Sequence, residues 1–357
     1  MSPPYPRSDH CDGHRFFNPG VRSHQGFGDF LRWQRERRPA RWPRRVDNTP
    51  YPPPLRAAPA GELHLTDIGH VTFLIQVEGC NLLTDPVWAP RASPLPFAGP
   101  KRVRAPGVAF DDLPRIDVVL LSHNHYDHLC LRTLRRLHER WQPVVITGLG
   151  NGRYLARKGI PGAIELDWWQ AWTPKPEVRV TYVPAQHWSS RSIFDRRRML
   201  WGGHVVDTPA GRVYFAGDSG YPPDGVPSFL QGIRKRLGRP DVALLPIGAY
   251  APRWFMATHH MDPQEAVRSH LDLGARLSVG MHQGVFQLTD EAWDEPPRLL
   301  AEARTRHGLG PADFTVLDVG QRLVRHAGGW SASEPLAAGR ATQGEPAHPG
   351  PTGCAAS

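Results

Sequence analysis

The chain has 357 residues, of which 40% are hydrophobic and 22% charged, and this composition is typical of a soluble protein with one large core or two smaller ones. No apolar run is long enough to cross a bilayer, and the Pro-rich start lacks the apolar segment of a secretory signal, so we expect a cytoplasmic protein. The formal net charge of +9 favours anionic partners.

Residues 1–60 are predicted to be a basic, Pro-rich N-terminal arm. They hold eleven arginines, no lysine and five acidic residues, a net charge of +6. The segment 27–38 carries apolar side chains at helical spacing followed by arginines, which predicts a short amphipathic helix with a basic end. This helix could dock on the core or lie on a membrane surface, where the arm would contact phospholipid headgroups. A solvated arm without a partner is the third alternative.

A catalytic domain is predicted over residues 61–326. It begins with three short strands, at 63–66, 71–77 and 81–84, in the pattern of an antiparallel meander. Asp85 closes the third strand. Metal-bound histidines usually donate their second N–H to a carboxylate, so Asp85 is a candidate for supporting a ligand histidine.

The next strand, predicted at 116–121, runs directly into a cluster of potential metal ligands. The sequence from Leu121 to Leu129 is Leu-Ser-His-Asn-His-Tyr-Asp-His-Leu. Imidazole and carboxylate ligands suit Zn, Fe and Mn. If the chain turns tightly after the strand, His123 and His125 can face one cation while Asp127 and His128 face a second.

A strand followed by a potential ligand occurs three more times. His187 follows a strand at 178–183, Asp218 follows one at 213–216, and His282 follows one at 277–281. Any one of these could be a surface loop. Together they predict a layered α/β sandwich whose strand ends converge on a two-metal centre.

The remaining predicted elements are supporting ones. We expect helices at 131–140, 263–273 and 296–306 and further strands at 144–147, 242–246 and 314–317. The glycines of 148–152 are interpreted as a turn. Residues 327–357 are expected to be a disordered tail, in which Cys354-Ala355-Ala356-Ser357 matches a prenylation box by chance.

The His-x-His-x-Asp-His spacing resembles the signature of the metallo-β-lactamase superfamily. Further stretches resemble the N-acylphosphatidylethanolamine-hydrolysing phospholipase D family, and they are 16–19, 83–86, 186–191, 215–218, 245–250, 252–256 and 262–267. The resemblance runs from about Phe16 to Leu300. It implies a four-layer αββα sandwich of metallo-β-lactamase type.

The resemblance also implies a role for each site residue. One Zn²⁺ would be held by His123, His125 and His187, the other by Asp127, His128 and His282, with Asp218 bridging the two. Asp218, Asp127 and His260 would be the catalytic residues, with His260 facing the substrate phosphate. Trp254 belongs to a set of tryptophans that could line a groove for acyl chains, and the alternative is that most of that set is core.

The function implied is a dinuclear zinc phosphodiesterase that cleaves N-acylphosphatidylethanolamine-like phospholipids to N-acylethanolamine and phosphatidic acid. The alternatives are a hydrolase of another ester, lactone or phosphodiester on the same site, and a non-catalytic metal-binding or membrane-associated protein. No nucleic-acid module is recognisable, so no nucleic-acid partner is expected. The resemblance suggests a homodimer. Gln283 stands where the family usually has Trp, which bears on lipid specificity.

Overall fold

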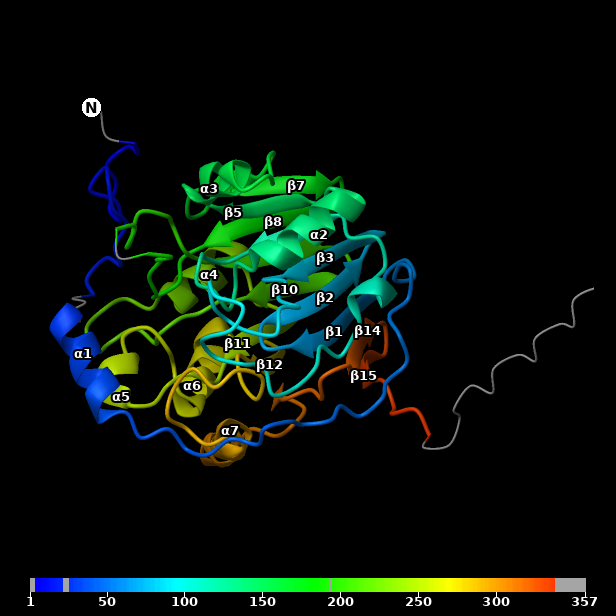
Figure 1. The fold of residues 1–357 in the computed structure, drawn as a ribbon. Helices are drawn as coiled ribbons and strands as arrows, with labels where there is room; N and C mark the ends of the chain where they lie inside the picture. The colour runs from blue at the N-terminus through cyan, green and yellow to red at the C-terminus, as the bar shows by residue number, and fades with distance from the viewer. Residues whose placement is uncertain (1–3, 22–25, 193, 338–357) are drawn as a thin grey trace, which may run out of the picture.

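The computed structural model describes residues 4–21, 26–192 and 194–337, and these form two packed sheets with helices outside (Figure 1). The eight-stranded sheet has the order β15-β14-β1-β2-β3-β4-β5-β6, and the seven-stranded sheet the order β13-β12-β11-β10-β9-β8-β7. This is the expected αββα sandwich.

The eight-stranded sheet combines an antiparallel meander with a parallel half. The meander β1–β3 is as predicted, and β3 continues through parallel pairs to β4, β5 and β6. Every residue of β1 to β4 is buried, because the second sheet covers one face and helices cover the other. The strands are β1 (Leu63–Gly69), β2 (Thr72–Val77), β3 (Cys80–Thr84), β4 (Val118–Leu121), β5 (Val144–Gly148), β6 (Ile164–Leu166), β14 (Arg322–His326) and β15 (Gly329–Ala332).

The seven-stranded sheet is antiparallel from β7 to β10 and parallel from β10 to β13. Parallel strands bring their carboxyl ends to one edge, and this is where the potential ligands follow the strands. The strands are β7 (Ala171–Lys175), β8 (Val178–Val183), β9 (Gly203–Thr208), β10 (Gly211–Phe215), β11 (Val242–Pro246), β12 (Leu277–Met281) and β13 (Phe314–Thr315).

Helices cover both outer faces of the sandwich. The outer face of the eight-stranded sheet carries α2 and α3, and that of the seven-stranded sheet carries α4, α6 and α7. Helix α6 begins as predicted, with Asp262 and Glu265 forming a capping box around Pro263. The helices are α1 (Phe27–Glu36), α2 (Leu131–Trp141), α3 (Asn151–Arg157), α4 (Phe229–Leu237), α5 (Arg253–Met256), α6 (Pro263–Leu273) and α7 (Glu295–Arg306), with a 3-10 turn at Phe110–Asp112.

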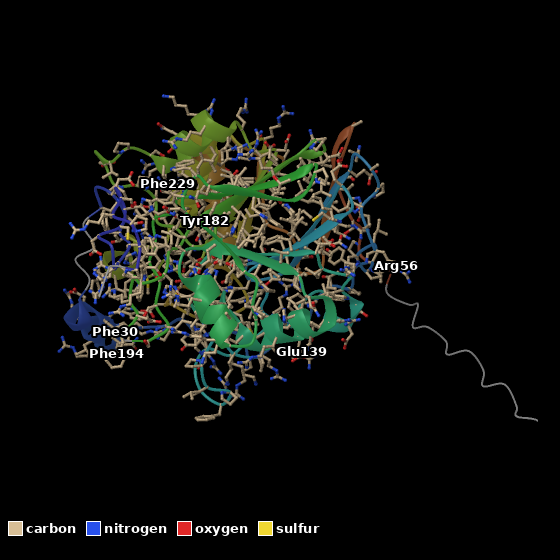
Figure 2. All side chains as sticks on the ribbon, turned by 90° about the horizontal axis from the view of Figure 1, so that it is seen from above. Phe30, Arg56, Glu139, Tyr182, Phe194 and Phe229 are labelled. Atoms are coloured by element: carbon tan, nitrogen blue, oxygen red, sulfur yellow. The ribbon has the colours of Figure 1, made fainter. Side chains whose placement is uncertain are left out.

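The main core lies between the two sheets, where Tyr182 is seen near the middle of the molecule in Figure 2. Its largest fully buried side chains include Phe73, Tyr214, Phe215 and Trp201. A second cluster packs α2 onto the eight-stranded sheet. Each fully buried aliphatic or aromatic side chain stabilises the fold by about 1.5–3 kcal/mol relative to an exposed one, so this core holds the strand ends rigidly.

The N-terminal arm packs on the sandwich along its described residues. Phe16 is 1% exposed within the main core. The Asn18 side-chain amide donates a hydrogen bond to the His187 carbonyl (2.8 Å). In α1, the Trp33 ring stacks on Phe255 of α5 at 5.0 Å, whereas Leu31 is half exposed. The arm is therefore docked on the core through these residues, whereas Arg32, Arg35 and Arg45 are more than half exposed, so the solvated basic arm and the contact with phospholipid headgroups both stay predictions.

Several elements differ from the sequence-based expectation. Strand β9 and helix α4 were not predicted, and the glycine-rich turn leads into the unpredicted helix α3. The tail was expected to be disordered from residue 327, but Gly329–Ala332 forms β15, which pairs with β14. The expectations for 338–357, including Cys354, lie outside the described residues.

Candidate metal centre

The strand ends of both sheets bring the predicted ligands together. His123, His125, Asp127 and His128 follow β4 of the eight-stranded sheet. From the seven-stranded sheet, His187 follows β8, Asp218 follows β10 and His282 follows β12. These side chains are at most 3% exposed, apart from His125 and Asp127, which are somewhat more exposed. The centre therefore lies at the seam where the two sheets meet.

One group of potential ligand atoms comes from His123, His125, His187 and Asp218, which lie within 4.8 Å of one another. His125 Nδ1 is 2.9 Å from His123 Nε2 and 3.1 Å from His187 Nε2. Asp218 Oδ2 is 3.9 Å from His123 Nε2 and 3.7 Å from His187 Nε2. Three imidazole nitrogens and one carboxylate oxygen converging in this way match the donor set of a tetrahedral zinc site.

A second group adjoins the first and consists of His70, Asp127, His128 and His282. Asp127 Oδ2 lies 3.1 Å from His70 Nε2, 3.4 Å from His128 Nε2 and 3.2 Å from His282 Nε2. Asp218 touches this group as well, because its Oδ2 is 3.1 Å from His128 Nε2 and its Oδ1 is 3.2 Å from His282 Nε2. Asp218 is thus the one carboxylate shared by both groups.

Two histidines are held in the tautomer that a metal ligand needs. His128 Nδ1 donates to Asp85 Oδ2 at 2.6 Å, which leaves Nε2 facing the site. His187 Nδ1 donates to the His259 carbonyl at 2.9 Å, with the same result. Asp85 is fully buried and also accepts from the backbone N–H and the hydroxyl of Ser122. Asp85 thus lies where a carboxylate that supports a ligand histidine would have to be, and that role stays a prediction.

The electrostatics of the site favour ionised carboxylates. Burial by itself raises the pKa of Asp218, but His128, His282 and His260 outweigh burial and hold this pKa well below its ordinary value. Burial lowers the pKa of His123 well below its ordinary range, and neighbouring His128 lowers it further. His123 therefore keeps a free lone pair at neutral pH.

The residues present fit a pair of metal ions. His128 Nε2 and Asp218 Oδ1 are buried and have no hydrogen-bond partner among the described residues, although both face the site. A buried polar atom without a partner is costly, and a cation between these atoms would satisfy them. The donors are imidazole and carboxylate with no thiolate, which suits Zn, Fe or Mn.

The expected substrate contacts are divided between the centre and the surface. His260 Nδ1 is 3.9 Å from Asp218 Oδ2, so His260 lies at the centre. Trp254 instead lies on α5, 44% exposed, with Arg32 of α1 4.6 Å above its ring. Of the other tryptophans, Trp188 packs edge-on against His125 at 4.8 Å, whereas Trp201 is core.

Sequence reasoning missed His70 and His259. His70 follows the end of β1 as the other ligands follow their strands, but it sits in a hairpin turn, which concealed the pattern. His70 and His282 both have φ of +63°, and the His282 N–H donates to the His70 carbonyl at 2.8 Å. Non-glycine residues in this left-handed region are uncommon and concentrate at functional sites. His259 gave no signal beyond its neighbour His260.

The comparisons with known proteins agree with this geometry. The family model for the beta-lactamase superfamily domain matches residues 80–283. N-acyl-phosphatidylethanolamine-hydrolyzing phospholipase D 1 of Caenorhabditis elegans is 36% identical over 274 residues, covering 72% of this chain and 75% of the relative. An uncharacterized protein of Mycobacterium tuberculosis is 41% identical over 254 residues, covering 70% of this chain and 66% of the relative.

Among solved structures, a metallo hydrolase from the archaeon Ignicoccus hospitalis has the same fold. Its TM-score is 0.56 at 22% identity, and the match covers 74% of this chain and 98% of that chain. The sandwich, the paired ligand groups and the relatives agree. The chain belongs to the metallo-β-lactamase superfamily of metal-dependent hydrolases and, within it, to the family of N-acylphosphatidylethanolamine-hydrolysing phospholipases D.

Proposed function

We propose that this protein is a dinuclear zinc phosphodiesterase of phospholipase D type. It hydrolyses N-acylphosphatidylethanolamine-like lipids to an N-acylethanolamine and a phosphatidic acid. The observation that carries the proposal is the pair of ligand groups that share Asp218. The activity for which the Caenorhabditis elegans relative is named supports the choice of substrate.

The bound metals would supply Lewis acidity toward the phosphoryl oxygens and lower the pKa of water to about 7. His123, His125 and His187 would hold one ion, and Asp127, His128 and His282 the other. Asp218 would be shared by the two ions, because its Oδ2 lies near His187 of one group and His128 of the other, and its Oδ1 lies near His282.

His260 is the side chain placed to contact the substrate phosphate. Burial lowers its pKa to about 4 despite the opposing charge of Asp218, so the imidazole is neutral at pH 7 and can donate one N–H to a phosphoryl oxygen. Arg253 holds this residue in place, because its guanidinium donates to the His260 carbonyl at 2.8 Å and to Glu265 at 2.6 Å.

The lipid would approach from the side that carries α1. Phe30 and Leu31 of α1 and Trp254 of α5 are each more than 40% exposed, and Arg32 lies among them. Figure 2 shows Phe30 on the same side of the molecule as Phe194, which is 78% exposed. Aromatic and aliphatic side chains beside arginines suit contact with anionic lipid headgroups. No helix among the described residues is long and apolar enough to span a membrane.

The test is metal content together with turnover of N-acylphosphatidylethanolamine, measured by mass spectrometry on the parent and on Asp218→Asn. We expect about two zinc ions per chain, release of N-acylethanolamine by the parent and loss of release in the variant. Asp207→Asn is the matched control, because Asp207 lies on β9, which pairs with the strand before Asp218, is 45% exposed and pairs with Arg212. It should behave as the parent.

The outcomes separate the levels of the proposal. Two bound metal ions per chain without release of N-acylethanolamine would contradict the phospholipase assignment. The substrate would then be another ester, lactone or phosphodiester hydrolysed at the same site. A parent that binds no metal after zinc reconstitution would overturn the centre itself. Release of N-acylethanolamine by Asp218→Asn at the parental rate would remove Asp218 from the machinery.

A further inference from the structure

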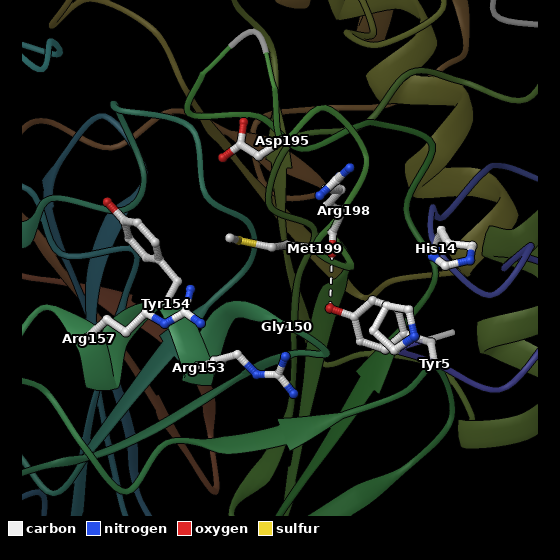
Figure 3. A pocket seen from close by; sticks show the side chains of 10 residues that line it. Tyr5, His14, Gly150, Arg153, Tyr154, Arg157, Asp195, Arg198 and Met199 are labelled. Atoms are coloured by element: carbon white, nitrogen blue, oxygen red, sulfur yellow. Dashed lines mark hydrogen bonds between the residues drawn. The ribbon is translucent and has the colours of Figure 1, made fainter. Parts of the chain in front are cut away.

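A basic cleft of about 240 Å³ lies outside the metal centre (Figure 3). Three segments far apart in the sequence form it: the N-terminal arm, helix α3 and the loop before β9. The arm contributes Tyr5 and His14, the helix contributes Arg153 and Arg157, and the loop contributes Arg198. Figure 3 shows Arg153 to the left of the Tyr5 ring and Arg198 above it in that view.

The three arginines of this cleft have no carboxylate partner. No hydrogen bond or ion pair within the described chain engages the guanidinium of Arg153, Arg157 or Arg198. Among the described residues, the only acidic residue that lines the cleft is Asp195. Its Oδ1 accepts hydrogen bonds within its own loop, from the backbone N–H groups of Arg191 and Ser192. The lining therefore carries a charge of +2, three arginines against one aspartate. Glu165 lies next to the cleft, where its carboxylate accepts from the backbone N–H groups of Gly152 and Arg153.

A second cleft of the molecule provides an internal comparison. It has about 390 Å³ and is lined by Arg56, Arg115 and Arg140, also with one aspartate. Two of these arginines are paired, because Arg140 lies 3.1 Å from Asp111 and Arg115 lies 3.9 Å from Asp117, whereas no ion pair of Arg56 is found among the described residues. Two of the three arginines are therefore neutralised in this cleft, whereas none of the three is paired in the first. Free guanidinium groups that converge on a cleft bind planar oxyanions such as phosphate through paired N–H donors.

The cleft is also built on ordered elements. The Tyr5 hydroxyl donates to the Arg198 carbonyl at 3.0 Å, which ties the arm to the loop. Both Arg153 and Arg198 act on the Tyr5 hydroxyl electrostatically. The Arg191 guanidinium lies 5.4 Å from the Tyr154 ring and 4.0 Å from the Tyr126 ring, so the wall of the cleft adjoins the metal-ligand loop. A ligand here would contact three segments at once.

From this arrangement we propose that the cleft is a second binding site, specific for a phosphate monoester. The dianion would lie between Arg153, Arg157 and Arg198. The volume of the cleft exceeds that of a phosphate group alone, so a small organic group esterified to it can rest against the rings of Tyr5 and Tyr154. The phosphate could belong to a soluble ester or to the headgroup of a phosphatidic acid, and the chemistry recognised is the same.

The test is calorimetric titration of the full-length, metal-loaded protein with glycerol 3-phosphate. The site variant is Arg153→Gln with Arg157→Gln, and the matched control is Arg115→Gln with Arg140→Gln in the second cleft. We expect saturable binding by the parent, a Kd raised by about tenfold or more in the site variant, and a parental Kd in the control. A parallel arm measures co-flotation with phosphatidylcholine vesicles that contain or lack phosphatidic acid.

Each outcome decides between the alternatives. Binding of glycerol 3-phosphate that weakens only in the site variant supports the site with a soluble ligand. Co-flotation that requires phosphatidic acid and is lost only in the site variant supports it with a lipid ligand. Equal binding by the parent and the site variant would overturn the proposal, since phosphate would then bind at the metal centre or elsewhere. Absence of binding in both arms would overturn it as well, and neither readout depends on lipid hydrolysis.

Discussion

At the scale of single residues, Asp85 positions a histidine of the candidate metal centre, although it belongs to neither of the two ligand groups described above. Its carboxylate accepts three hydrogen bonds, from His128 Nδ1 and from two groups of Ser122, and it is fully buried. An amide has one acceptor oxygen and cannot satisfy all three donors. The position and basicity of His128 therefore depend on the charge of Asp85.

We expect Asp85→Asn to weaken zinc binding by about 10- to 100-fold, the usual cost of losing a carboxylate that supports a ligand histidine. Competition with a chromophoric chelator measures the affinity. Asp117→Asn is the control, because Asp117 accepts a hydrogen bond from the Asn81 N–H at the opposite end of β4. Equal zinc affinity in Asp85→Asn and the parent would show that His128 needs no such support.

His70 is the residue whose role the sequence did not reveal. Its Nε2 lies 3.1 Å from Asp127 Oδ2, and its Nδ1 is buried without a partner among the described residues. Because Asp127, His128, His282 and Asp218 already provide four donors, we interpret His70 as an N–H donor that orients Asp127. If His70 were instead a direct ligand, a side chain at this position that can donate an N–H to Asp127 but binds zinc poorly would not keep the metal ion in place.

We therefore expect His70→Gln to retain both zinc ions and His70→Ala to lose affinity for one of them by about tenfold or more. The glutamine side chain can still donate an N–H to Asp127. Metal stoichiometry by mass spectrometry gives the result. His64→Gln is the control, because His64 is a buried histidine on β1, the strand that His70 follows, and pairs with Glu62 at 2.7 Å. Loss of one zinc from His70→Gln would make His70 a ligand.

At the scale of elements, the N-terminal arm is held by a titrating pair. His10 Nε2 lies 2.8 Å from Asp167 Oδ1, and the His10 ring stacks on Trp168 at 4.3 Å. Burial lowers the pKa of His10, but hydrogen bonds to Asp167 and Asp9 outweigh burial and raise it above 6.5. Burial raises the pKa of Asp167, but the hydrogen bond from His10 outweighs it and lowers this pKa below 3.8.

The two shifts predict how stability depends on pH. The raised pKa of His10 stabilises the folded state fully below 6.5, and this stabilisation is lost as the pH rises through the folded pKa. The lowered pKa of Asp167 stabilises the folded state above pH 3.8, and this stabilisation is lost as the pH falls through the folded pKa. In urea denaturation at about pH 5.5 and pH 8, the change in stability between the two pH values should shift in favour of the higher pH in His10→Gln and stay parental in His14→Gln. An unchanged difference in His10→Gln would contradict the pairing.

The elements also show what could and could not be predicted from the sequence. Strand β4 is a continuous apolar run and β12 is mostly apolar, and each is followed by a polar residue that can bind metal, so both the strands and the candidate ligands after them were predicted. Strand β9 begins at Gly203-His204 and alternates poorly, and its burial follows from its neighbours β8 and β10 instead. The docking of the arm depends on contacts across more than 150 residues, such as His10 with Asp167, which local patterns do not encode.

At the scale of the whole molecule, the metal centre joins two sheets that otherwise meet through their apolar faces. The eight-stranded sheet supplies the His123–His128 loop and Asp85, and the seven-stranded sheet supplies His187, Asp218 and His282. A pair of ions held here would bind only when both sheets are packed. Metal binding is then linked to folding, because the unfolded chain has no such arrangement of donors.

We accordingly expect zinc to raise the melting temperature of the metal-free protein. A free zinc concentration of about 100 times the Kd adds about 2.7 kcal/mol of stability, which is roughly 5 °C for a domain of this size. In Asp218→Asn the shift should be much smaller, because that residue faces both ligand groups, whereas in Asp207→Asn it should be parental. A zinc-induced shift of the same size in Asp218→Asn and the parent would mean that the ions are held without the shared carboxylate. The two ligand groups would then be independent sites, each with residues from both sheets.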